Sequence, residues 1–409
     1  MGSGLLLVVF VVGRLLNAQT LGGQESKGDS FGAVVHAVDA VSPTIVLANN
    51  GNHSLVAVSA KMQGRVLTSS ADGLKGRSLG FVNGTFIASR QVAEHMNAYG
   101  GEDRVWIGPE GGQFSVFFAP GAPFDLDHWF TPKPFDTEPF EVVGQTKSSV
   151  DFRKSFKLVN YSGTEFNVRI DREIRIFSDD EIWKKLQVAP QPGLKVVGFE
   201  SINKLTNAGA KAWTEKTGLL SLWILGQFPA SAAATIVVPI REGSTAELGE
   251  RANAAYFGQI PEDRLAVKLN VVYLKADAES RGKLGINPKR AKGILGSYDA
   301  LHHVLTLVYY TLPGGKAKYV NSAWKIQDDP FSGDVANSYN DGPQPGSGAR
   351  LGHFYEMESS SPAAALAPGQ SVEHVQRTIH IEGEERQLDK IARATLGVGI
   401  SEIQNAFAQ

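Results

Sequence analysis

The 409-residue chain contains no cysteine. This absence excludes disulfides, thiolate metal sites, iron–sulfur clusters and cysteine nucleophiles. The chain also lacks an excess of charge of either sign, because 40 Lys and Arg stand against 42 Asp and Glu and give a formal net charge of −2. Binding to phosphate backbones normally needs a basic face, so we expect no nucleic-acid partner. The composition, 42% hydrophobic and 20% charged, is that of a folded globular protein.

Common signatures of enzymatic sites are missing as well. Neither an H-E-x-x-H metal motif nor a G-x-G-x-x-G dinucleotide-binding motif occurs in the chain. The run Gly314-Gly315-Lys316-Ala317 lacks the Ser or Thr that follows the lysine of a phosphate-binding loop, so we interpret it as a hairpin turn. The nine histidines are not spaced like metal ligands, which leaves the question of a metal open. We expect no cofactor.

The N-terminus has features of an export signal. The apolar run Leu5–Val12 is too short to span a bilayer as a helix, which needs about 20 residues, and a stretch rich in Gly, Ser and Gln follows it. We therefore predict a signal peptide at residues 1–18 and a flexible tail at residues 19–30, with a periplasmic or secreted mature protein that has no membrane association after cleavage. No Lys or Arg precedes the run, so a buried first strand is the alternative.

Strand patterns dominate the rest of the chain. The 44 Gly and 19 Pro favour many short elements joined by turns. Apolar residues recur mostly with a period of two from Phe31 onward, and helical spacing is confined to Asp179–Leu186 and Glu384–Ala408. These patterns predict an all-β fold, a single antiparallel domain over residues 31–409 built from two sheets packed face to face, with a short C-terminal helix. The predicted strands include Ser54–Ser59, Ser115–Phe118, Val150–Leu158, Phe166–Phe177, Ala234–Ile240, Leu265–Leu274, Val304–Tyr310, Gly352–Ser359 and Val372–Ile381.

Three segments carry more polar groups than a plain β-sandwich needs. The first, His95–Gln113, mixes both charge signs and aromatic rings with glycines, which allow the backbone to approach a ligand closely. A glycine-rich surface loop is the alternative interpretation. The candidate substrate contacts in this segment are His95, Asn97, Arg104, Trp106 and Glu110.

The second segment, Tyr319–Gly342, offers amides, carboxylates and aromatic rings that suit a sugar, with Asp341 as the candidate contact, although a long turn explains it equally well. The third segment, His353–Pro362, contains Glu356 and Glu358. These glutamates are two residues apart, so in a strand both project from one face, separated by about 7 Å. Either that face is solvated or one carboxylate is a base with a tuned pKa.

This third segment resembles the C-terminal part of galactose-mutarotase-like (aldose 1-epimerase-like) proteins. In that superfamily a strand with a catalytic glutamate precedes a proline and an L-x-P-G turn. Here Met357-Glu358-Ser359-Ser360, Pro362 and Leu366-Ala367-Pro368-Gly369 match that order. Asn97–Gly101 is similar to the superfamily's Asn…Gly-Gly substrate loop, and Leu205-Thr206-Asn207 is similar to its L-T-N-H motif. The chain looks most like an uncharacterised bacterial family within this superfamily, which implies a large antiparallel β-supersandwich.

The resemblance also implies a carbohydrate-active protein that binds a mono- or oligosaccharide. Glu358 would be the general base that takes a proton from the anomeric hydroxyl, and Glu356 would contact the substrate. Ala208 stands where the family has its acid histidine, so another acid is needed; His95, His128 and His353 are candidates, and His353 is the preferred one. The expected function is an exported mutarotase- or epimerase-like enzyme, or a related lyase or hydrolase. A non-catalytic carbohydrate-binding protein on the same fold is the alternative.

Overall fold

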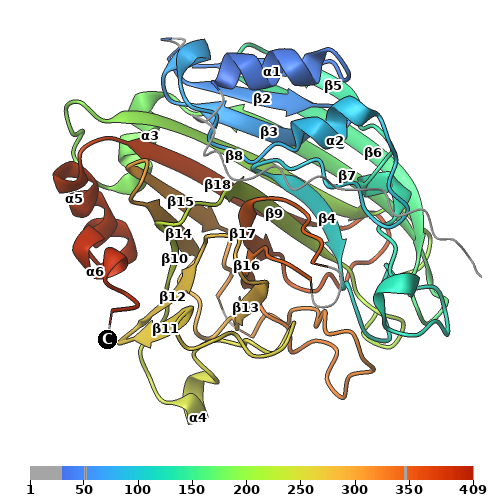
Figure 1. The fold of residues 1–409 in the computed structure, drawn as a ribbon. Coiled ribbons are helices and arrows are strands. Elements are labelled where there is room, and N and C mark those ends of the chain that lie inside the picture. The colour runs from blue at the N-terminus through green and yellow to red at the C-terminus, as the bar shows by residue number, and fades with distance from the viewer. Residues whose placement is uncertain (1–29, 50, 52, 315, 345–347, 409) are drawn as a thin grey trace, which may run out of the picture.

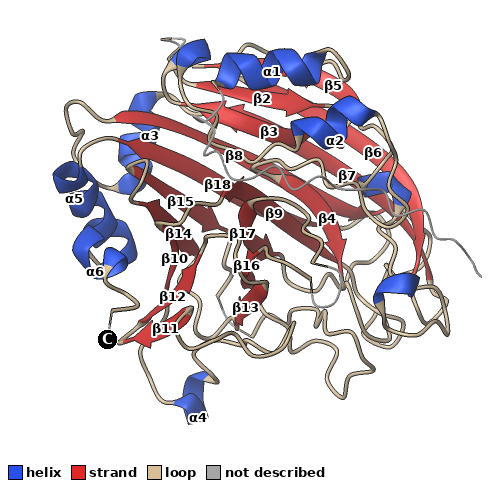
Figure 2. Ribbon diagram, viewed as in Figure 1, coloured by secondary structure: helices blue, strands red, loops and turns tan. Residues whose placement is uncertain are grey.

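The structure is a computed structural model that describes residues 30–49, 51, 53–314, 316–344 and 348–408. The predicted signal peptide and, apart from Ser30, the predicted tail lie outside the described residues. Strands far outnumber helices (Figure 1, Figure 2), which confirms the all-β prediction. In the part of the chain that the structure describes, no helix is long and apolar enough to cross a membrane.

The largest layer is a ten-stranded antiparallel sheet. Its order is β11-β12-β10-β14-β15-β18-β8-β7-β6-β5, and it runs diagonally through the whole molecule in Figure 1. Along β7 every second residue is buried, because side chains alternate between the interior and the outer side of the sheet. The strands are β5 (Glu141–Gln145), β6 (Ser149–Val159), β7 (Glu165–Ile176), β8 (Lys195–Asn207), β10 (Ala234–Pro239), β11 (Leu265–Lys268), β12 (Val271–Lys275), β14 (Ile294–Asp299), β15 (Val304–Tyr310) and β18 (Ser371–Glu382).

A five-stranded antiparallel sheet, of order β13-β16-β17-β9-β4, packs face to face with this large sheet. Side chains meet between the two layers. The hydroxyl oxygen of Tyr355 lies 2.7 Å from Oγ of Ser297, and Oε2 of Glu102 lies 2.9 Å from Nε2 of His380. The two layers form the predicted supersandwich. The strands are β4 (Arg104–Gly108), β9 (Ser221–Pro229), β13 (Gly282–Ile286), β16 (Ala336–Asn340) and β17 (Phe354–Ser360).

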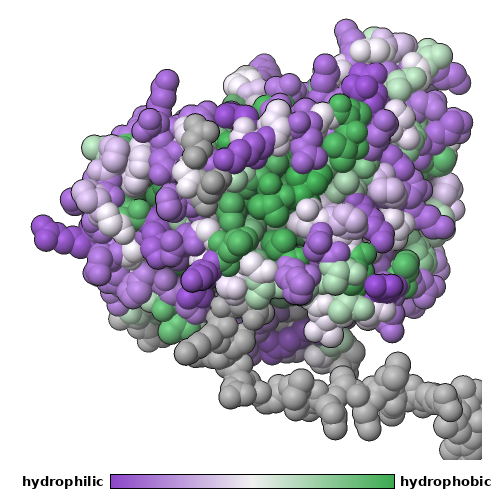
Figure 3. Space-filling model, turned by 90° about the horizontal axis from the view of Figure 1, so that it is seen from above, coloured by the Kyte–Doolittle hydropathy of each residue, from purple (hydrophilic) through white to green (hydrophobic). Residues whose placement is uncertain are grey.

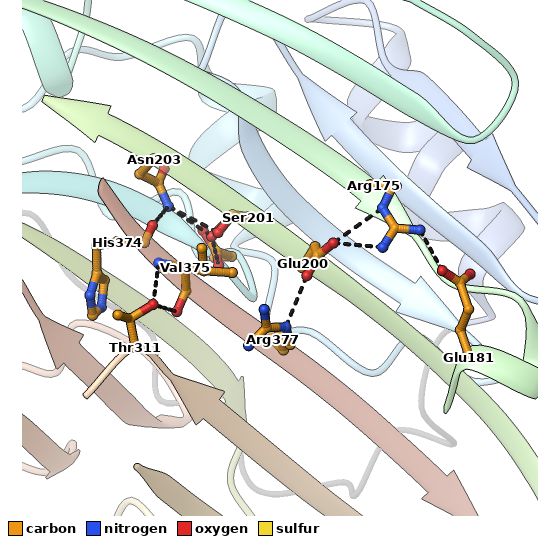
Figure 4. Close-up of polar contacts among 10 residues, drawn as sticks. Arg175, Glu181, Glu200, Ser201, Asn203, Thr311, His374, Val375 and Arg377 are labelled. Carbon is orange, nitrogen blue, oxygen red and sulfur yellow. Dashed lines mark hydrogen bonds and ion pairs between the residues drawn. The ribbon is translucent and has the colours of Figure 1, made fainter. Parts of the chain in front are cut away.

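Strand β8 shows how the large sheet separates its two faces (Figure 4). Asn203 is on the inner face, where its Nδ2 donates a hydrogen bond of 3.0 Å to Oγ of Ser201. Glu200 has the opposite parity, and its carboxylate accepts hydrogen bonds from Arg175 at 2.6 Å and from Arg377 at 2.9 Å. Alternation along one strand therefore places an amide network inside the sandwich and a cross-strand charge ladder on the other side.

A third, small sheet and helix α1 (Phe31–Asp39) cover one end of the molecule, at the top of Figure 1. Sequence periodicity predicts strands from Phe31 onward, so α1 is a departure from that prediction. The side chain of Ser30 caps the helix by accepting a hydrogen bond from the backbone N–H of Ala33. Phe31 and Val38 lie two turns apart and are both buried against the sheet. The strands of this sheet are β1 (Ile45–Ala48), β2 (Leu55–Ser59) and β3 (Arg65–Ser70).

The C-terminal segment is helical, as predicted, but it is divided. Helix α5 (Glu385–Leu396) ends at Gly397, whose φ of +77° is a left-handed conformation that favours glycine, and α6 (Ile400–Gln404) follows. Helix α3 (Asp179–Leu186) has the predicted bounds and begins with a capping box formed by Ser178 and Glu181. The remaining helical elements are α2 (Gly84–Ser89), α4 (Thr245–Leu248) and the 3-10 turns at Gly73–Lys75, Leu126–His128 and Lys133–Phe135.

Two strand predictions need correction. Ser115–Phe118 belongs to a loop, in which Phe118 makes only an isolated bridge to Trp129. Leu265–Leu274 is a hairpin of β11 and β12, because Leu269 adopts a φ of +52° and reverses the chain. The other strands listed from the sequence all occur, with bounds shifted by at most a few residues.

The side of the molecule with α1 and β5 carries an apolar surface area, which is green in Figure 3. Exposed valines occur in two strands on this side: Val46 in β1, and Val142 and Val143 in β5. The surface around this area is mostly hydrophilic (Figure 3).

Candidate functional site

The outer face of the five-stranded sheet, which points away from the large sheet, carries a cluster of charged, amide and indole side chains. Glu356 and Glu358 of β17 project from this face, because side chains alternate along the strand and Tyr355, the residue before Glu356, points inward. Cross-strand pairing sets Glu356 opposite Gln227 of β9, and Glu358 opposite Asn337 of β16. The same alternation adds further members of this outer-face cluster, namely Arg104, Trp106, Trp223 and Lys283.

Glu356 is held by two donors. Its Oε1 accepts hydrogen bonds from Nη2 of Arg104 at 2.9 Å and from Nε2 of Gln227 at 2.7 Å. The Arg104 guanidinium also lies 4.3 Å above the ring of Trp106. Burial raises the pKa of Glu356 to about 7, with the charge of Arg104 acting against the rise and that of Glu358 adding to it. The sequence alone does not give the direction in which the pKa of this carboxyl group shifts. In the structure, desolvation is the largest cause, and the pKa shifts upward.

Glu358 is fully buried and has a cation of its own. Its Oε2 accepts hydrogen bonds from the indole Nε1 of Trp223 at 2.8 Å and from Nζ of Lys283 at 3.1 Å. The ammonium also lies 4.8 Å from the centre of the Trp223 ring. Burial lowers the pKa of Lys283, but the nearby carboxylates, with Glu358 foremost, outweigh this effect and hold the pKa above its usual value. Lys283 is therefore a stable positive charge beside Glu358.

A small cavity of about 20 Å³ lies beside Lys283, which is room for about one water molecule. Its other polar lining residues come from segments that are far apart in the chain: Glu110, Ser221, Tyr256, Ser322, Asp334, Asn337 and Ser360. Burial raises the pKa of Glu110; the charge of Lys283 opposes this effect, and that of Glu358 adds to it. Glu110 is thus a carboxyl group at the cavity wall that holds its proton more tightly than a surface glutamate.

Tyr256 and Asp334 form a second polar pair at the cavity. The Tyr256 hydroxyl lies 2.6 Å from Oδ2 of Asp334, to which Nδ2 of Asn253 also donates at 3.0 Å. Burial raises the pKa of Asp334, although these two hydrogen bonds oppose the rise. Among the described residues, no group of three or more His, Cys, Asp or Glu is arranged to hold a metal ion.

Five buried side-chain atoms of this face have no hydrogen-bond partner among the described residues. They include donors and acceptors, and all belong to strands β4, β9 and β17. Buried polar atoms normally have a hydrogen-bond partner. Five unpartnered atoms on one face of a sheet are therefore typical of a binding site and not of ordinary core packing. The five atoms are Nε of Arg104, Nε1 of Trp106, Oγ of Ser221, Oε1 of Gln227 and Oε1 of Glu358.

A model described as a family of unknown function, DUF6786, matches residues 29–407 of the chain. The chain belongs to the DUF6786 family. No curated protein matches it.

Several solved structures are similar to this DUF6786 protein. A protein described provisionally as an aldose 1-epimerase from Escherichia coli K12 is 13% identical, with a TM-score of 0.49, and the match covers 83% of this chain and 99% of that chain. A galactose mutarotase-like protein from Lactobacillus casei is 13% identical, with the same coverages and a TM-score of 0.46. A galactose mutarotase related enzyme from Lactobacillus acidophilus is 10% identical, with coverages of 83% and 97% and a TM-score of 0.44. These similarities agree with the resemblance stated from the sequence and concern the fold alone.

The structure of this DUF6786 protein brings five of the predicted site residues together. Arg104, Trp106, Glu356 and Glu358 are on the outer face, and Glu110 follows β4 at the cavity wall. Trp106 is buried in an aromatic cluster and lies beneath the Arg104 guanidinium, so its ring is packed against protein on several sides.

The other four predicted site residues lie apart from the cavity. His95 is half-buried, and its Nδ1 lies 2.7 Å from the carbonyl oxygen of Trp129. Asn97 is fully buried and donates to Asp136. Asp341 accepts hydrogen bonds from the Tyr339 hydroxyl and the Gly352 N–H. His353 is exposed just before β17, five residues from Glu358, or roughly 17 Å along an extended chain.

The motif similar to L-T-N-H also lies elsewhere in this DUF6786 protein. Asn207 ends β8 in the large sheet, where its Nδ2 donates to the carbonyl oxygens of Lys211 and Leu366. Ala208, at the position of the family's acid histidine, is exposed. This motif therefore contributes no acid to the outer-face cluster.

Lys283, Trp223, Gln227 and Tyr256 are members of the site that the sequence did not single out. Lys283 had the clearest signal, since it is the one charged residue of the short strand β13, whose sequence is GKLGI. Trp223 and Gln227 look like ordinary members of a buried strand, and Tyr256 lies in a loop without a recognisable pattern.

Proposed function

We propose that this DUF6786 protein binds a mono- or oligosaccharide at the outer-face cluster of the five-stranded sheet. The observation that supports this most is the set of five unpartnered buried atoms, which combines donors on β4 with acceptors on the neighbouring strands β9 and β17. A sugar hydroxyl both donates and accepts a hydrogen bond, so a polyhydroxylated ring suits such a mixed set. Indole rings beside it add the apolar surface that saccharide sites usually contain.

The cavity restricts how binding occurs. Its volume of about 20 Å³ is far below the roughly 300 to 1,000 Å³ of typical ligand pockets. A sugar ring therefore needs part of the cavity lining to move, and Tyr256 and the segment with Val320 and Ser322 belong to that lining.

We further propose that the protein is an exported enzyme that uses Glu358 as general base in a mutarotase- or epimerase-like reaction. One oxygen of Glu358 is held by Trp223 and Lys283, and the other has no partner among the described residues, so it can accept a proton from the anomeric hydroxyl. A purely binding protein on the same fold is the second candidate, and the unpartnered buried atoms of the outer face are equally compatible with it.

Titration calorimetry with neutral mono- and oligosaccharides tests the binding proposal. Arg104→Ala removes a charged contact at the cluster, and we expect its Kd to rise about 10- to 100-fold. The matched control is Arg153→Ala, because Arg153 is an exposed arginine that also pairs with one carboxylate, Asp171. Its Kd is expected to stay within about twofold. If Arg104→Ala binds every sugar that the wild type binds with an unchanged Kd, the outer face is not the binding site.

For a sugar that binds, anomer interconversion followed by NMR tests the role of Glu358. Glu358→Gln keeps the shape of the side chain but removes the base, so kcat is expected to fall about 10²- to 10⁴-fold. Full activity of Glu358→Gln with loss in Glu356→Gln would move the base to Glu356. Full activity in both variants would leave the mutarotase-like mechanism without support.

A further inference from the structure

Ring opening of a sugar needs an acid as well as a base, and Ala208 cannot supply it. We propose that the carboxyl group of Glu110 is the proton donor to the ring oxygen and that it acts together with the base Glu358, whose hydrogen-bond partner Lys283 lines the same cavity as Glu110. This inference rests on the proposed function, because it assigns a second role in the same reaction. It also changes the role of Glu110 from a substrate contact to a catalytic residue.

The backbone of Glu110 is fixed where the side chain meets the cavity. Its N–H donates to Oγ of Ser322 at 3.1 Å, and its carbonyl oxygen accepts from the hydroxyl of Ser115. The side chain lines the cavity together with Lys283 and Tyr256. A carboxyl group anchored at the cavity wall in this way meets the positional requirement for a general acid.

Glu110 and Glu358 have different charge partners. Glu358 accepts from an ammonium at 3.1 Å and from an indole N–H at 2.8 Å. Glu110 takes part in none of the ion pairs within the described residues. Burial raises the pKa of Glu110 and Glu358 adds to this, while Lys283, the Trp324 side chain and Arg281 oppose it. Two carboxyl groups in such different surroundings can take opposite roles, one as acid and one as base.

The other candidate donors at the cavity fit less well. Tyr256 already directs its hydroxyl to Asp334 at 2.6 Å, and burial raises its pKa well above the usual value, which makes it a weak acid. Asp334 accepts from both Tyr256 and Asn253 on one oxygen. The polar lining of the cavity includes no histidine within the described residues.

The step balances without any further reactant. Glu358 takes the proton of the anomeric hydroxyl, the bond between C1 and the ring oxygen breaks, and Glu110 gives its proton to that oxygen. The product is the open-chain aldehyde. After rotation about the C1–C2 bond, closure of the ring returns one proton to Glu110 and the other to the sugar, so both carboxyl groups regain their starting states.

The test compares Glu110→Gln and Glu110→Asp with the wild type in anomer interconversion from pH 4 to 9. We expect Glu110→Gln to lose about 10²- to 10⁴-fold in kcat with KM within a few-fold, and to lose the fall in rate at high pH that a protonated donor causes. Glu110→Asp keeps a carboxyl group and should retain part of the rate and that high-pH limb. Glu165→Gln, an exposed glutamate on β7 that is paired with Lys157, is the control and should match the wild type.

The outcomes separate this inference from the proposed function. Full kcat and an intact high-pH limb in Glu110→Gln overturn the inference and leave the binding proposal and Glu358 in place. Saccharide binding by the wild type without interconversion of anomers overturns it in favour of the non-catalytic alternative. If no saccharide binds, the proposed function fails and the inference fails with it. Circular dichroism and thermal unfolding of each variant show whether a loss of rate reflects loss of fold.

Discussion

Charged side chains are buried on both faces of the five-stranded sheet, and the two faces satisfy them differently. On the inner face, Nη2 of Arg172 contacts Oδ1 of Asp103 at 2.5 Å, and neither side chain is exposed. The second oxygen of Asp103 accepts from Ser201 at 2.8 Å, and Arg172 donates further to the Gly64 carbonyl and to Asn203. Every side-chain nitrogen and oxygen of this ion pair therefore has a protein partner.

On the outer face the pairing is incomplete. Arg104 and Glu358 each have one ion-pair partner, but Nε of Arg104 and Oε1 of Glu358 remain without a hydrogen bond among the described residues. Burial without full pairing is unfavourable for the folded state and is tolerated where a ligand or reactant completes the pairing. The difference indicates that the inner charges stabilise the sandwich and that the outer charges are available for binding. This distinction can be tested on each face separately.

The largest effect is expected from breaking the inner pair. Arg172→Leu leaves Asp103 buried and uncompensated, which typically costs 3–5 kcal/mol of unfolding free energy. Burial already raises the pKa of Asp103 while Arg172 opposes the rise, so removal of Arg172 should raise this pKa further. Urea denaturation measures the loss, and the double variant Asp103→Leu with Arg172→Leu should recover much of it. A loss below about 1 kcal/mol in the single variant would show that the inner network is not a stabilising feature.

A pH-dependent effect of intermediate size is expected on the outer face. The pKa of Glu356 is raised from 4.5 to about 7 in the folded protein. A carboxyl group with a raised pKa favours the folded state at low pH and loses this advantage as pH rises from about 4.5 to 7. A shift of this size corresponds to about 3 kcal/mol at 1.36 kcal/mol per pKa unit. The stability of the wild type relative to Glu356→Gln should therefore fall by about that amount across this range.

Denaturation curves of both proteins at pH 4.5, 6 and 8 measure this difference. Glu165→Gln, at an exposed position, should give a pH profile parallel to that of the wild type. Parallel profiles for Glu356→Gln and the wild type would mean that Glu356 titrates near its ordinary pKa and that the outer face is better solvated than its burial indicates.

Local patterns were enough for most of the fold. The bounds of β15 and α3 follow from a short, mostly apolar run of strand length in one and from helical spacing in the other. Helix α1 was missed because its sequence, FGAVVHAVD, is apolar on nearly all sides and fits a strand as well as a helix. The Ser30 cap and the packing against the small sheet stabilise the helical conformation. This packing is a tertiary effect, so it cannot be inferred from the helix propensities of the residues.

The site shows the same limit more strongly. The common face of Glu356 and Glu358 follows from their spacing of two residues, which is local information. The partners Lys283, Trp223 and Gln227 follow from the sheet order β13-β16-β17-β9-β4, in which Trp223 and Glu358 on neighbouring strands are 135 residues apart in the chain. One sequence does not reveal this order, because each of these strands could pair with many others. His353 and His95 were chosen for their chemistry alone, and the structure places both away from the cavity.

The smallest expected effect provides the finest test of the comparison, because it uses two amides of similar chemistry. Gln227 on the outer face donates to Glu356 at 2.7 Å, but its Oε1 has no partner among the described residues. Asn203 on the inner face uses both ends of its amide, accepting from Arg172 and donating to Ser201.

Replacing an incompletely paired amide by an apolar group loses one hydrogen bond but also removes a buried unpaired acceptor, so the two contributions nearly cancel. Gln227→Leu should therefore change the unfolding free energy by less than about 1 kcal/mol, whereas Asn203→Leu should cost about 2–3 kcal/mol by leaving buried donors unpaired. If urea denaturation gives equal losses of unfolding free energy for the two variants, the polar groups of the two faces are paired to the same extent. The incomplete pairing would then no longer support a binding site on the outer face.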